Sequence, residues 1–246
     1  MAHRFLLGFL CSVFISSTIA KIPSYIHVCK RNDPELDKCV LNSVEILKPK
    51  LVKGIPELDI PALEPLSLKD LVLQHGGRAL KFSGTNYIIH GASNYEIDDL
   101  KLDLPNKVFQ VQMRFPKIVL DADYEVAGKF LSFNLQGKGP VNVVAENIDG
   151  KAILKGKQLM KNGKEYFILD SMDLKLNLKN YELKLSRGFF KDQAVTDAIN
   201  VALHENKREI INLVRPRLEE VVKDVLLDTA NKITNHFTYD ELFPES

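Results

Sequence analysis

Residues 194–237 read AVTDAINVALHENKREIINLVRPRLEEVVKDVLLDTANKITNHF and carry apolar residues three or four positions apart. This spacing places the apolar side chains on one stripe of a helix. The pattern is interrupted over 204–206, so we expect a shorter helix up to about residue 203 and a long helix over about 206–236. One continuous helix would be roughly 65 Å long, and an apolar stripe of that length needs a partner. The stripe consists of Val195, Ile199, Ala202, Ile211, Val214, Leu218, Val222, Val225 and Ile233.

The middle of the chain, from about Lys69 to Leu185, predicts that partner, because the apolar period changes there to two. Apolar and polar residues alternate in Phe109–Phe115, Leu131–Leu135 and Met172–Leu178, as in antiparallel strands with one dry and one wet face. The phase flips after Pro116, where we expect a bulge or a bend. Turn signals then predict seven or eight long strands connected mostly by tight turns. These signals are Gly76-Gly77, Pro105-Asn106, Gly137–Pro140, Asp149-Gly150 and Asn162-Gly163.

A sheet with one apolar face and a helix with one apolar stripe can bury these surfaces against each other. We therefore predict an α+β fold in which a long, highly curved antiparallel sheet wraps around the long C-terminal helix. A short N-terminal helix is expected to begin with Asp33 as its N-cap and Pro34 in its first turn, and to end at Pro49. The next segment, GIPELDIPALEPL at 54–66, has prolines at intervals that favour extended backbone.

The start of the chain has the pattern of a secretory signal peptide. Arg4 precedes an apolar run over Phe5–Ile15, and small residues lead to Thr18-Ile19-Ala20. This run is too short for a bilayer span, which needs about 20 apolar residues. We expect residues 1–20 to be removed as a signal peptide, which leaves residues 21–246 as a single exported domain.

Two cysteines, Cys29 and Cys39, remain in the mature chain, because Cys11 leaves with the signal peptide. An even pair in an oxidising export route indicates a structural disulfide that closes a short loop. A redox or metal site is the weaker interpretation, because the spacing is not CxxC and His27 is the only histidine beside either cysteine. The disulfide would tie the N-terminal segment to the first helix, and a loop of this size contributes about 3 kcal/mol to stability.

Charge and motifs exclude several function classes. The chain has 33 Lys+Arg and 32 Asp+Glu, and the loss of Arg4 leaves 32 of each. Balanced charge argues against a nucleic acid or an anionic membrane as the partner. GxSxG, HExxH, P-loop and GxGxxG motifs are absent from the sequence. We therefore expect a protein that is not an enzyme and has no cofactor and no metal.

Two short patterns have both a chemical and a structural interpretation. Gly137-Lys138-Gly139 could be a phosphate loop, but Pro140 follows and no helix opens there, so a hairpin turn is favoured. Asp121, Asp123 and Glu125 alternate as in a calcium loop, but they lack its glycine and its terminal glutamate spacing. A solvated strand face is therefore the better account of these acids.

A series of motifs occurs in a fixed order along the mature chain. They are Cys29 and Cys39, GIPELDIPALEPL at 54–66, Gly91 with Asn94-Tyr95, Phe115-Pro116-Lys117, Gly137–Pro140, Asn162–Tyr166 and Tyr239–Pro244. In this order they resemble the insect takeout and juvenile-hormone-binding protein family. The resemblance implies that the wrapped sheet encloses an elongated apolar cavity, as in the tubular lipid-binding folds. The mature chain lacks the cysteines for the further disulfide of haemolymph juvenile hormone carriers, so it is more similar to the takeout branch.

The resemblance implies a secreted, extracellular carrier that reversibly binds a small lipophilic ligand, such as a terpenoid, a fatty-acid-like or a hormone-like molecule. Apolar walls would provide affinity by desolvation, and two tyrosines would orient the ligand through their hydroxyls. The residues expected to line the cavity are Tyr87, Ile89, Phe109, Val111, Met113, Phe115, Tyr124, Phe133, Val214, Leu218, Val222 and Val225. For each of them, ordinary core is the competing interpretation.

Two other function classes remain open at this stage. The first is a secreted interaction or signalling protein with a dry core and no small-molecule cargo. The second is a secreted hydrolase with a scattered active site, for which the sequence names no residue. We expect a monomer with no nucleic-acid partner, and transient contact with a membrane or a receptor during delivery stays open.

Overall fold

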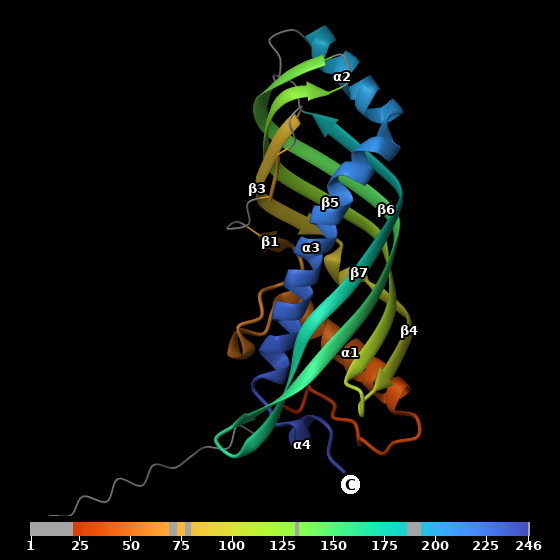
Figure 1. Cartoon of the computed structure of the whole chain (residues 1–246), viewed down its shortest axis with the longest axis vertical. Coiled ribbons are helices and arrows are strands. Elements are labelled where there is room, and N and C mark those ends of the chain that lie inside the picture. The colour runs from red at the N-terminus through yellow and green to blue at the C-terminus, as the bar shows by residue number, and fades with distance from the viewer. Residues whose placement is uncertain (1–21, 69–72, 77–79, 131–132, 186–192, 246) are drawn as a thin grey trace, which may run out of the picture.

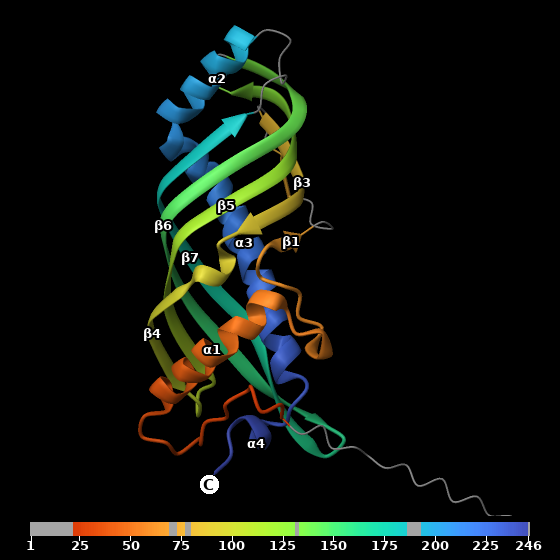
Figure 2. The same cartoon turned by 180° about the vertical axis from the view of Figure 1, so that it is seen from behind.

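The computed structural model describes residues 22–68, 73–76, 80–130, 133–185 and 193–245, so the predicted signal peptide lies outside the described residues. Within these ranges a long antiparallel sheet curves around a long C-terminal helix, as the two periods of the sequence predict (Figure 1, Figure 2). Its strands are β1 (Leu66–Leu68), β2 (Leu73–Gly76), β3 (Leu80–His90), β4 (Glu96–Asp103), β5 (Val108–Phe130), β6 (Phe133–Lys161) and β7 (Lys164–Leu185).

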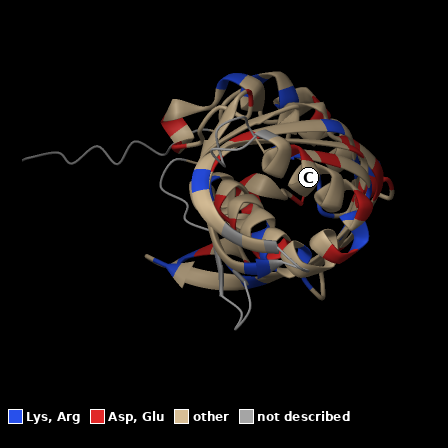
Figure 3. Ribbon diagram, turned by 90° about the horizontal axis from the view of Figure 1, so that it is seen from above, with Lys and Arg blue, Asp and Glu red and all other residues tan. Residues whose placement is uncertain are grey.

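Strand order explains how the sheet closes around the helix. The hydrogen-bonded path is β1-β3-β5-β6-β7, while β2 also pairs with β3 and β4 also pairs with β5. The three longest strands, β5, β6 and β7, therefore form the middle and one edge. Seen along the long axis, the sheet curves into a ring with basic and acidic residues interspersed around it (Figure 3).

The helices are α1 (Leu36–Lys53), α2 (Gln193–Glu205), α3 (Lys207–Thr234) and the short α4 (Tyr239–Leu242), with single turns η1 (Pro56–Leu58) and η2 (Ala92–Asn94). The predicted interruption is confirmed at Asn206, whose Nδ2 donates to the carbonyl of Ala202 at 2.8 Å. This contact ends α2 and redirects the chain into α3. None of the described helices is long and apolar enough to cross a membrane.

The first helix extends further than predicted. The predicted start, with Asp33 as N-cap and Pro34 in the first turn, is wrong, because α1 begins at Leu36 with Glu35 as its N-cap. Asp33 lies in the turn before the helix, where its Oδ1 accepts from the backbone N–H of Glu35 at 2.8 Å. At its other end, α1 continues through Pro49 to Lys53 and ends at Gly54, where φ is +82°. Leu51, beyond the proline, is 8% exposed and packs with the N-terminal apolar cluster. Its burial offsets the backbone hydrogen bond that Pro49 removes.

The N-terminal segment and the 54–66 stretch form a second apolar cluster beneath α1. The disulfide Cys29–Cys39 is present and ties the segment before α1 to the first turns of the helix, as predicted. The expectation of extended backbone over 54–66 is wrong in part, because η1 and the bridge between Ile55 and Ile60 fold this stretch into a compact loop. Its apolar side chains Ile55, Leu58 and Ile60 are 2–3% exposed.

Two predicted turns are wrong. Gly137–Pro140 and Asp149-Gly150 both lie inside β6, which pairs with β5 without a break in register from Phe133 to Lys155. Gly137–Pro140 are held in the strand by pairing with β5, and Asp149-Gly150 by pairing with both β5 and β7. The predicted turns at Pro105-Asn106 and Asn162-Gly163 are confirmed, with φ of +53° and +74° at Asn162 and Gly163. Gly77 of the Gly76-Gly77 signal lies outside the described residues.

The predicted phase flip after Pro116 is confirmed, and it is shared by three strands. In β5 the inward set changes from Val111, Met113 and Phe115 to Ile118, which packs against the same core. The flip occurs where Pro116 and Asn147 interrupt the ladder, and Asn147 has φ of +54°. The register between β5 and β6 does not change across this point, so the feature is a matched kink across the sheet rather than a one-strand bulge.

Polar side chains of the two long helices cover the open edge of the sheet along β7. The amide of Asn231 both accepts from the N–H and donates to the C=O of Leu169, each at 2.8 Å. Glu219 accepts from the N–H of Leu176 at 2.9 Å. Near the end of β7, Asn200 makes the same kind of two-way contact with Leu185, at 3.1 and 3.4 Å. These contacts fix the register of the helices on β7 and satisfy an edge that would otherwise pair with another chain.

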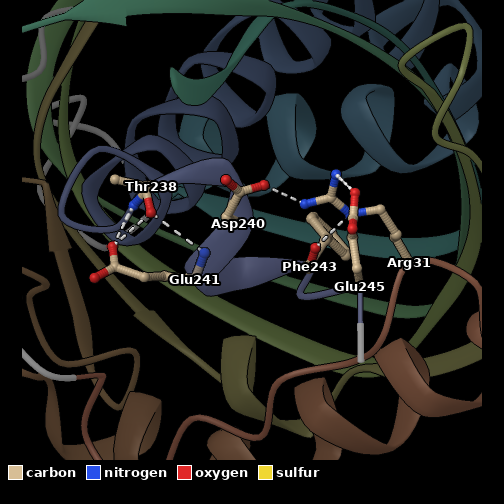
Figure 4. A network of polar contacts seen from close by, with 6 residues as sticks. All are labelled: Arg31, Thr238, Asp240, Glu241, Phe243 and Glu245. Carbon is tan, nitrogen blue, oxygen red and sulfur yellow. Dashed lines mark hydrogen bonds and ion pairs between the residues drawn. The ribbon is translucent and has the colours of Figure 1, made fainter. Parts of the chain in front are cut away.

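The C-terminus closes the end of the molecule near α4 through a polar network (Figure 4). Thr238 and Glu241 form a capping box at the start of α4. Arg31 donates from Nε to the carbonyl of Phe243 at 2.7 Å and forms ion pairs with Asp240 and Glu245. The hydrogen bond with Asp240 raises the pKa of Arg31 above its ordinary value. The network therefore joins the first described segment to the last.

Candidate ligand-binding site

The interior between the sheet and α3 brings together many of the residues predicted to line a cavity. Val111, Met113 and Phe115 of β5 pack against one buried cluster, and so do three predicted residues of α3. The α3 residues are Val214, Leu218 and Val222. Strand and helix residues that lie about a hundred positions apart in the sequence thus share a single apolar interior.

The predicted residues of β5 and α3 are only partly buried in this interior. These six predicted residues, three from β5 and three from α3, remain partly accessible although they lie between the sheet and the helix. The fully buried members of the cluster lie mostly on β6, β7 and the start of α3. In a close-packed interior, voids larger than a water molecule are few. A bound apolar molecule would cover the parts of these β5 and α3 side chains that remain accessible to solvent.

Glycine creates room on the β6 side of this interior. A Cβ placed at Gly150 would lie 3.0 Å from Met113 Cγ and 3.5 Å from a methyl group of Leu176. A side chain at this position would displace Met113 by a few tenths of an ångström. The Asp149-Gly150 pair, which resembles a turn in the sequence, therefore serves the packing of the interior.

The two predicted tyrosines lie beside one glycine. Tyr87 is 6% exposed, and its hydroxyl covers Gly84 so closely that a Cβ there would be 2.1 Å away. Gly84 in turn pairs across the sheet with Tyr124, which pairs on its other side with Gly139. Burial raises the pKa of Tyr124 to about 12. Its phenol is therefore neutral at physiological pH and keeps a proton that it can donate.

The remaining predicted residues lie elsewhere in the fold. Phe109 lies near the α4 end, where its ring meets Phe167 edge-on at 5.4 Å between centroids. Ile89 is partly buried on β3, and Val225 is partly buried on α3, where its carbonyl accepts from Thr229. Phe133 begins β6, but its side chain lies outside the described residues.

Sequence reasoning undervalued the contribution of β6 and β7. Most of the buried cluster comes from these strands and from the two long helices. For β7 the signal was present in the alternation of Met172–Leu178, whereas Val143-Val144-Ala145 of β6 shows no alternation. The buried residues not predicted for the site are Ala145, Ile148, Ala152, Met172, Leu174, Leu176, Tyr181, Ile199, Ile210 and Ile211.

A small surface cleft of about 230 Å³ lies where α2 meets α3 beside the end of β7. Its apolar floor includes Leu183 and Leu203, and its rim carries Lys184, His204 and Lys207. None of the predicted lining residues belongs to it. The hydroxyl of Tyr181 donates to the carbonyl of Lys207 there, so part of the cleft is occupied by the contact that anchors α3 to the sheet.

The metal interpretations of the sequence find little support among the described residues. One group of potential metal ligands comes together there, namely His27, Cys29 and Cys39. Both cysteines are consumed by the disulfide, so no thiolate is available to a metal ion. Asp121 and Asp123 lie exposed on the outer face of β5, where they accept from Asn142 and Asn86. This agrees with the solvated strand face that the sequence favoured.

Comparisons with known proteins identify the family. A sequence model described as "Haemolymph juvenile hormone binding protein (JHBP)" matches residues 6–244. The chain belongs to this family. It is 22% identical over 232 residues to the "Circadian clock-controlled protein daywake" of Drosophila melanogaster, which covers 90% of this chain and 88% of that protein. It is also 22% identical over 223 residues to the "Putative beta-carotene-binding protein" of Schistocerca gregaria, covering 89% and 88% of the two chains.

A solved structure shows that the family fold is present. The crystal structure of Epiphyas postvittana Takeout 1 superimposes with a TM-score of 0.76 at 16% identity, and covers 89% of this chain and 100% of that chain. The curved sheet around a long C-terminal helix is therefore the fold of this juvenile hormone binding protein family member. The predicted resemblance to the takeout and juvenile-hormone-binding proteins is confirmed.

Proposed function

We propose that this chain is a carrier that reversibly binds a small lipophilic molecule between the concave face of its sheet and α3. The observation that carries the proposal is the partial accessibility of facing apolar residues, in particular Met113, Phe115 and Leu218. Membership of a family described by the binding of juvenile hormone supports it, as does similarity to a protein named for beta-carotene binding. Both named ligands are apolar molecules.

In this proposal the affinity comes from desolvation. Each square ångström of apolar surface removed from water contributes about 25 cal/mol, less the cost of ordering the ligand. Tyr87 and Tyr124 supply the few polar groups that orient a ligand, because each phenol has a large apolar body and one hydrogen-bonding tip. Their neighbour Gly84 has no side chain, which leaves room for the hydroxyl of Tyr87.

The carrier acts outside the cell in this proposal. Residues 1–20 have the pattern of a signal peptide, and a disulfide such as Cys29–Cys39 is typical of an oxidising compartment. Residues 21–246 then form one mature domain that needs no partner subunit and performs no chemical conversion. With two mature cysteines, the chain fits the takeout branch of the family, and the cargo is a terpenoid, a fatty-acid-like or a hormone-like molecule.

A fluorescent fatty-acid probe tests this proposal. Phe115→Asp and Leu218→Asp each place a carboxylate on the apolar wall and should weaken probe binding at least tenfold. A tenfold loss corresponds to about 55 Å² of apolar contact at 25 cal/mol per Å². Ile153→Asp makes the same kind of change on the outer face of β6, where the side chain is 43% exposed, and should bind as wild type does.

Circular dichroism must first show that all three variants are folded. If folded Phe115→Asp and Leu218→Asp bind the probe as tightly as Ile153→Asp does, the proposed interior site is wrong. If wild type binds no probe at all, a dry-core interaction protein becomes the better account.

A further inference from the structure

The hairpin that joins β6 to β7 projects beyond the body of the sheet at the end where α4 lies (Figure 1, Figure 2). Its base is fixed, because Phe167 is 3% exposed and Tyr166 forms a bridge with Thr238. Beyond this base, every residue from 157 to 164 is exposed on both faces of the ribbon. The protein body therefore covers neither face of the tip.

The tip carries apolar side chains where a solvated hairpin would be polar. Met160 is 66% exposed and Leu159 is 48% exposed, and both lie within three residues of the Asn162-Gly163 turn. They point to opposite faces of the ribbon because successive strand residues alternate. Leu159 pairs with Tyr166, which places an aromatic ring beside it on the same face. An apolar group with a tyrosine at its border is typical of a segment that enters a membrane interface.

Three lysines lie on the Leu159 face of this apolar tip, while Glu165 lies directly opposite Met160 on the other face. Lys161 and Lys164 are directly opposite each other across the ribbon, and Lys157 lies on the same face. Like charges in directly opposed positions destabilise a strand pair. Lys157 is paired with Asp170, but among the described residues no ion pair neutralises Lys161 or Lys164. An anionic surface would relieve this repulsion.

From this placement we infer that the β6–β7 hairpin docks tip-first onto an anionic lipid bilayer. Leu159 and Met160 enter the interface and Tyr166 lies at its border, while Lys161 and Lys164 contact lipid phosphate and carboxylate groups. The balanced net charge of the chain does not oppose this, because the positive charge is local to the tip and membrane attraction decays within a Debye length. Docking goes beyond carriage, since it locates the surface from which a cargo would be exchanged with a membrane.

Vesicle flotation with the mature, disulfide-bonded protein tests the inference. Wild type should float with vesicles of phosphatidylcholine and phosphatidylserine at 7:3, and should float poorly with pure phosphatidylcholine. Each juxtamembrane lysine contributes about fivefold in affinity, so Lys161→Ala with Lys164→Ala should lose about 25-fold. The matched control is Lys138→Ala with Lys151→Ala, which removes two exposed lysines from the body of the same strand and should change affinity less than twofold.

The apolar part of the tip is tested separately. Leu159→Ser with Met160→Ser should weaken binding at least tenfold while leaving its dependence on salt concentration unchanged. The residues changed are exposed and far from the interior, so both tip variants should have the same Tm as wild type and should bind the fatty-acid probe normally. Leu218→Asp should float as wild type does, which separates a failure of docking from a failure of carriage.

Two results would overturn the inference. One is a wild type that floats with neither vesicle composition at 0.1 M salt, which would leave the tip to a protein partner. The other is an equal loss of binding in the tip variant and in the Lys138/Lys151 control.

Discussion

We predict that the side chain of Asn231 holds the edge strand β7 on α3. Its side chain is partly buried and makes two hydrogen bonds of 2.8 Å to the N–H and C=O of Leu169. Asn231→Ala leaves both backbone groups without this partner, and each unsatisfied group costs about 1–3 kcal/mol when buried. Because the site is only partly buried, we expect about 2 kcal/mol in total. For a domain of this size that corresponds to a fall in Tm of about 4–8 °C.

The control for this prediction is Asn212→Ala. Asn212 lies exposed on the same helix, where its side chain accepts only from Arg215 at 3.0 Å. Both changes gain the same helix propensity from alanine, so the difference between the two variants reports the contact with β7 together with the weaker contact that Asn231 accepts from Thr234 at 3.4 Å. Urea unfolding gives the free energies, and hydrogen exchange at the Leu169 amide reports the local opening. If the two variants have equal stability and the Leu169 amide stays protected in Asn231→Ala, the edge-closing role is refuted.

Two further predictions concern ionisation and the disulfide. Burial raises the pKa of Tyr124 to about 12, so the ultraviolet difference titration between wild type and Tyr124→Phe should be centred near pH 12, and a step near pH 10 would contradict the burial. Because the folded chain holds this proton more tightly than the unfolded chain does, the stabilisation is complete below pH 10 and is lost as the pH rises toward 12. Removing the Cys29–Cys39 bridge, which spans 10 residues in sequence, with paired serines should cost about 3 kcal/mol. A change below 1 kcal/mol in urea unfolding would show that the N-terminal cluster holds this segment without the disulfide.

The architecture could be predicted because the helical period and the strand period of the sequence each extend over many residues. The helical stripe from Ile199 to Ile233 and the alternation of Met172–Leu178 both survive in the structure as faces of α2, α3 and β7. Val195 was wrongly assigned to the stripe, because it is 38% exposed and Thr196, at 1% exposed, takes the inward position. The interruption at 204–206 was also predictable, because three polar residues break the stripe there. These patterns specify which face of the sheet and which stripe of the helix must be buried. A sheet that wraps around the helix buries both.

Local turn chemistry was a poor guide inside β6. Gly137–Pro140 and Asp149-Gly150 have the composition of turns, yet both are held in a continuous strand by pairing with β5 on one side. Here the preference of these residues for a turn is outweighed by backbone hydrogen bonds to strand residues that are distant in the chain. Gly150 also has a packing role beside Met113 that becomes visible only once the two strands are placed together.

The apolar interior between the sheet and α3 could be predicted only on the side that carries a regular period. Val111, Met113, Phe115, Val214 and Leu218 were found because they alternate or recur every three or four residues. The polar helix residues that hold β7 gave no such signal. Asn200, Glu219 and Asn231 look like solvent-facing positions, and their role depends on backbone groups of an edge strand that the sequence does not display.

Mass spectrometry of the organic extract from natively purified, disulfide-bonded protein tests the central claim most directly. The account predicts an apolar molecule in stoichiometric amount from wild type, and its loss from folded Phe115→Asp and Leu218→Asp. A lipophile that is retained equally by wild type and both variants would place it outside the proposed interior. An empty extract from wild type, together with no binding of the fatty-acid probe, would contradict the carrier function.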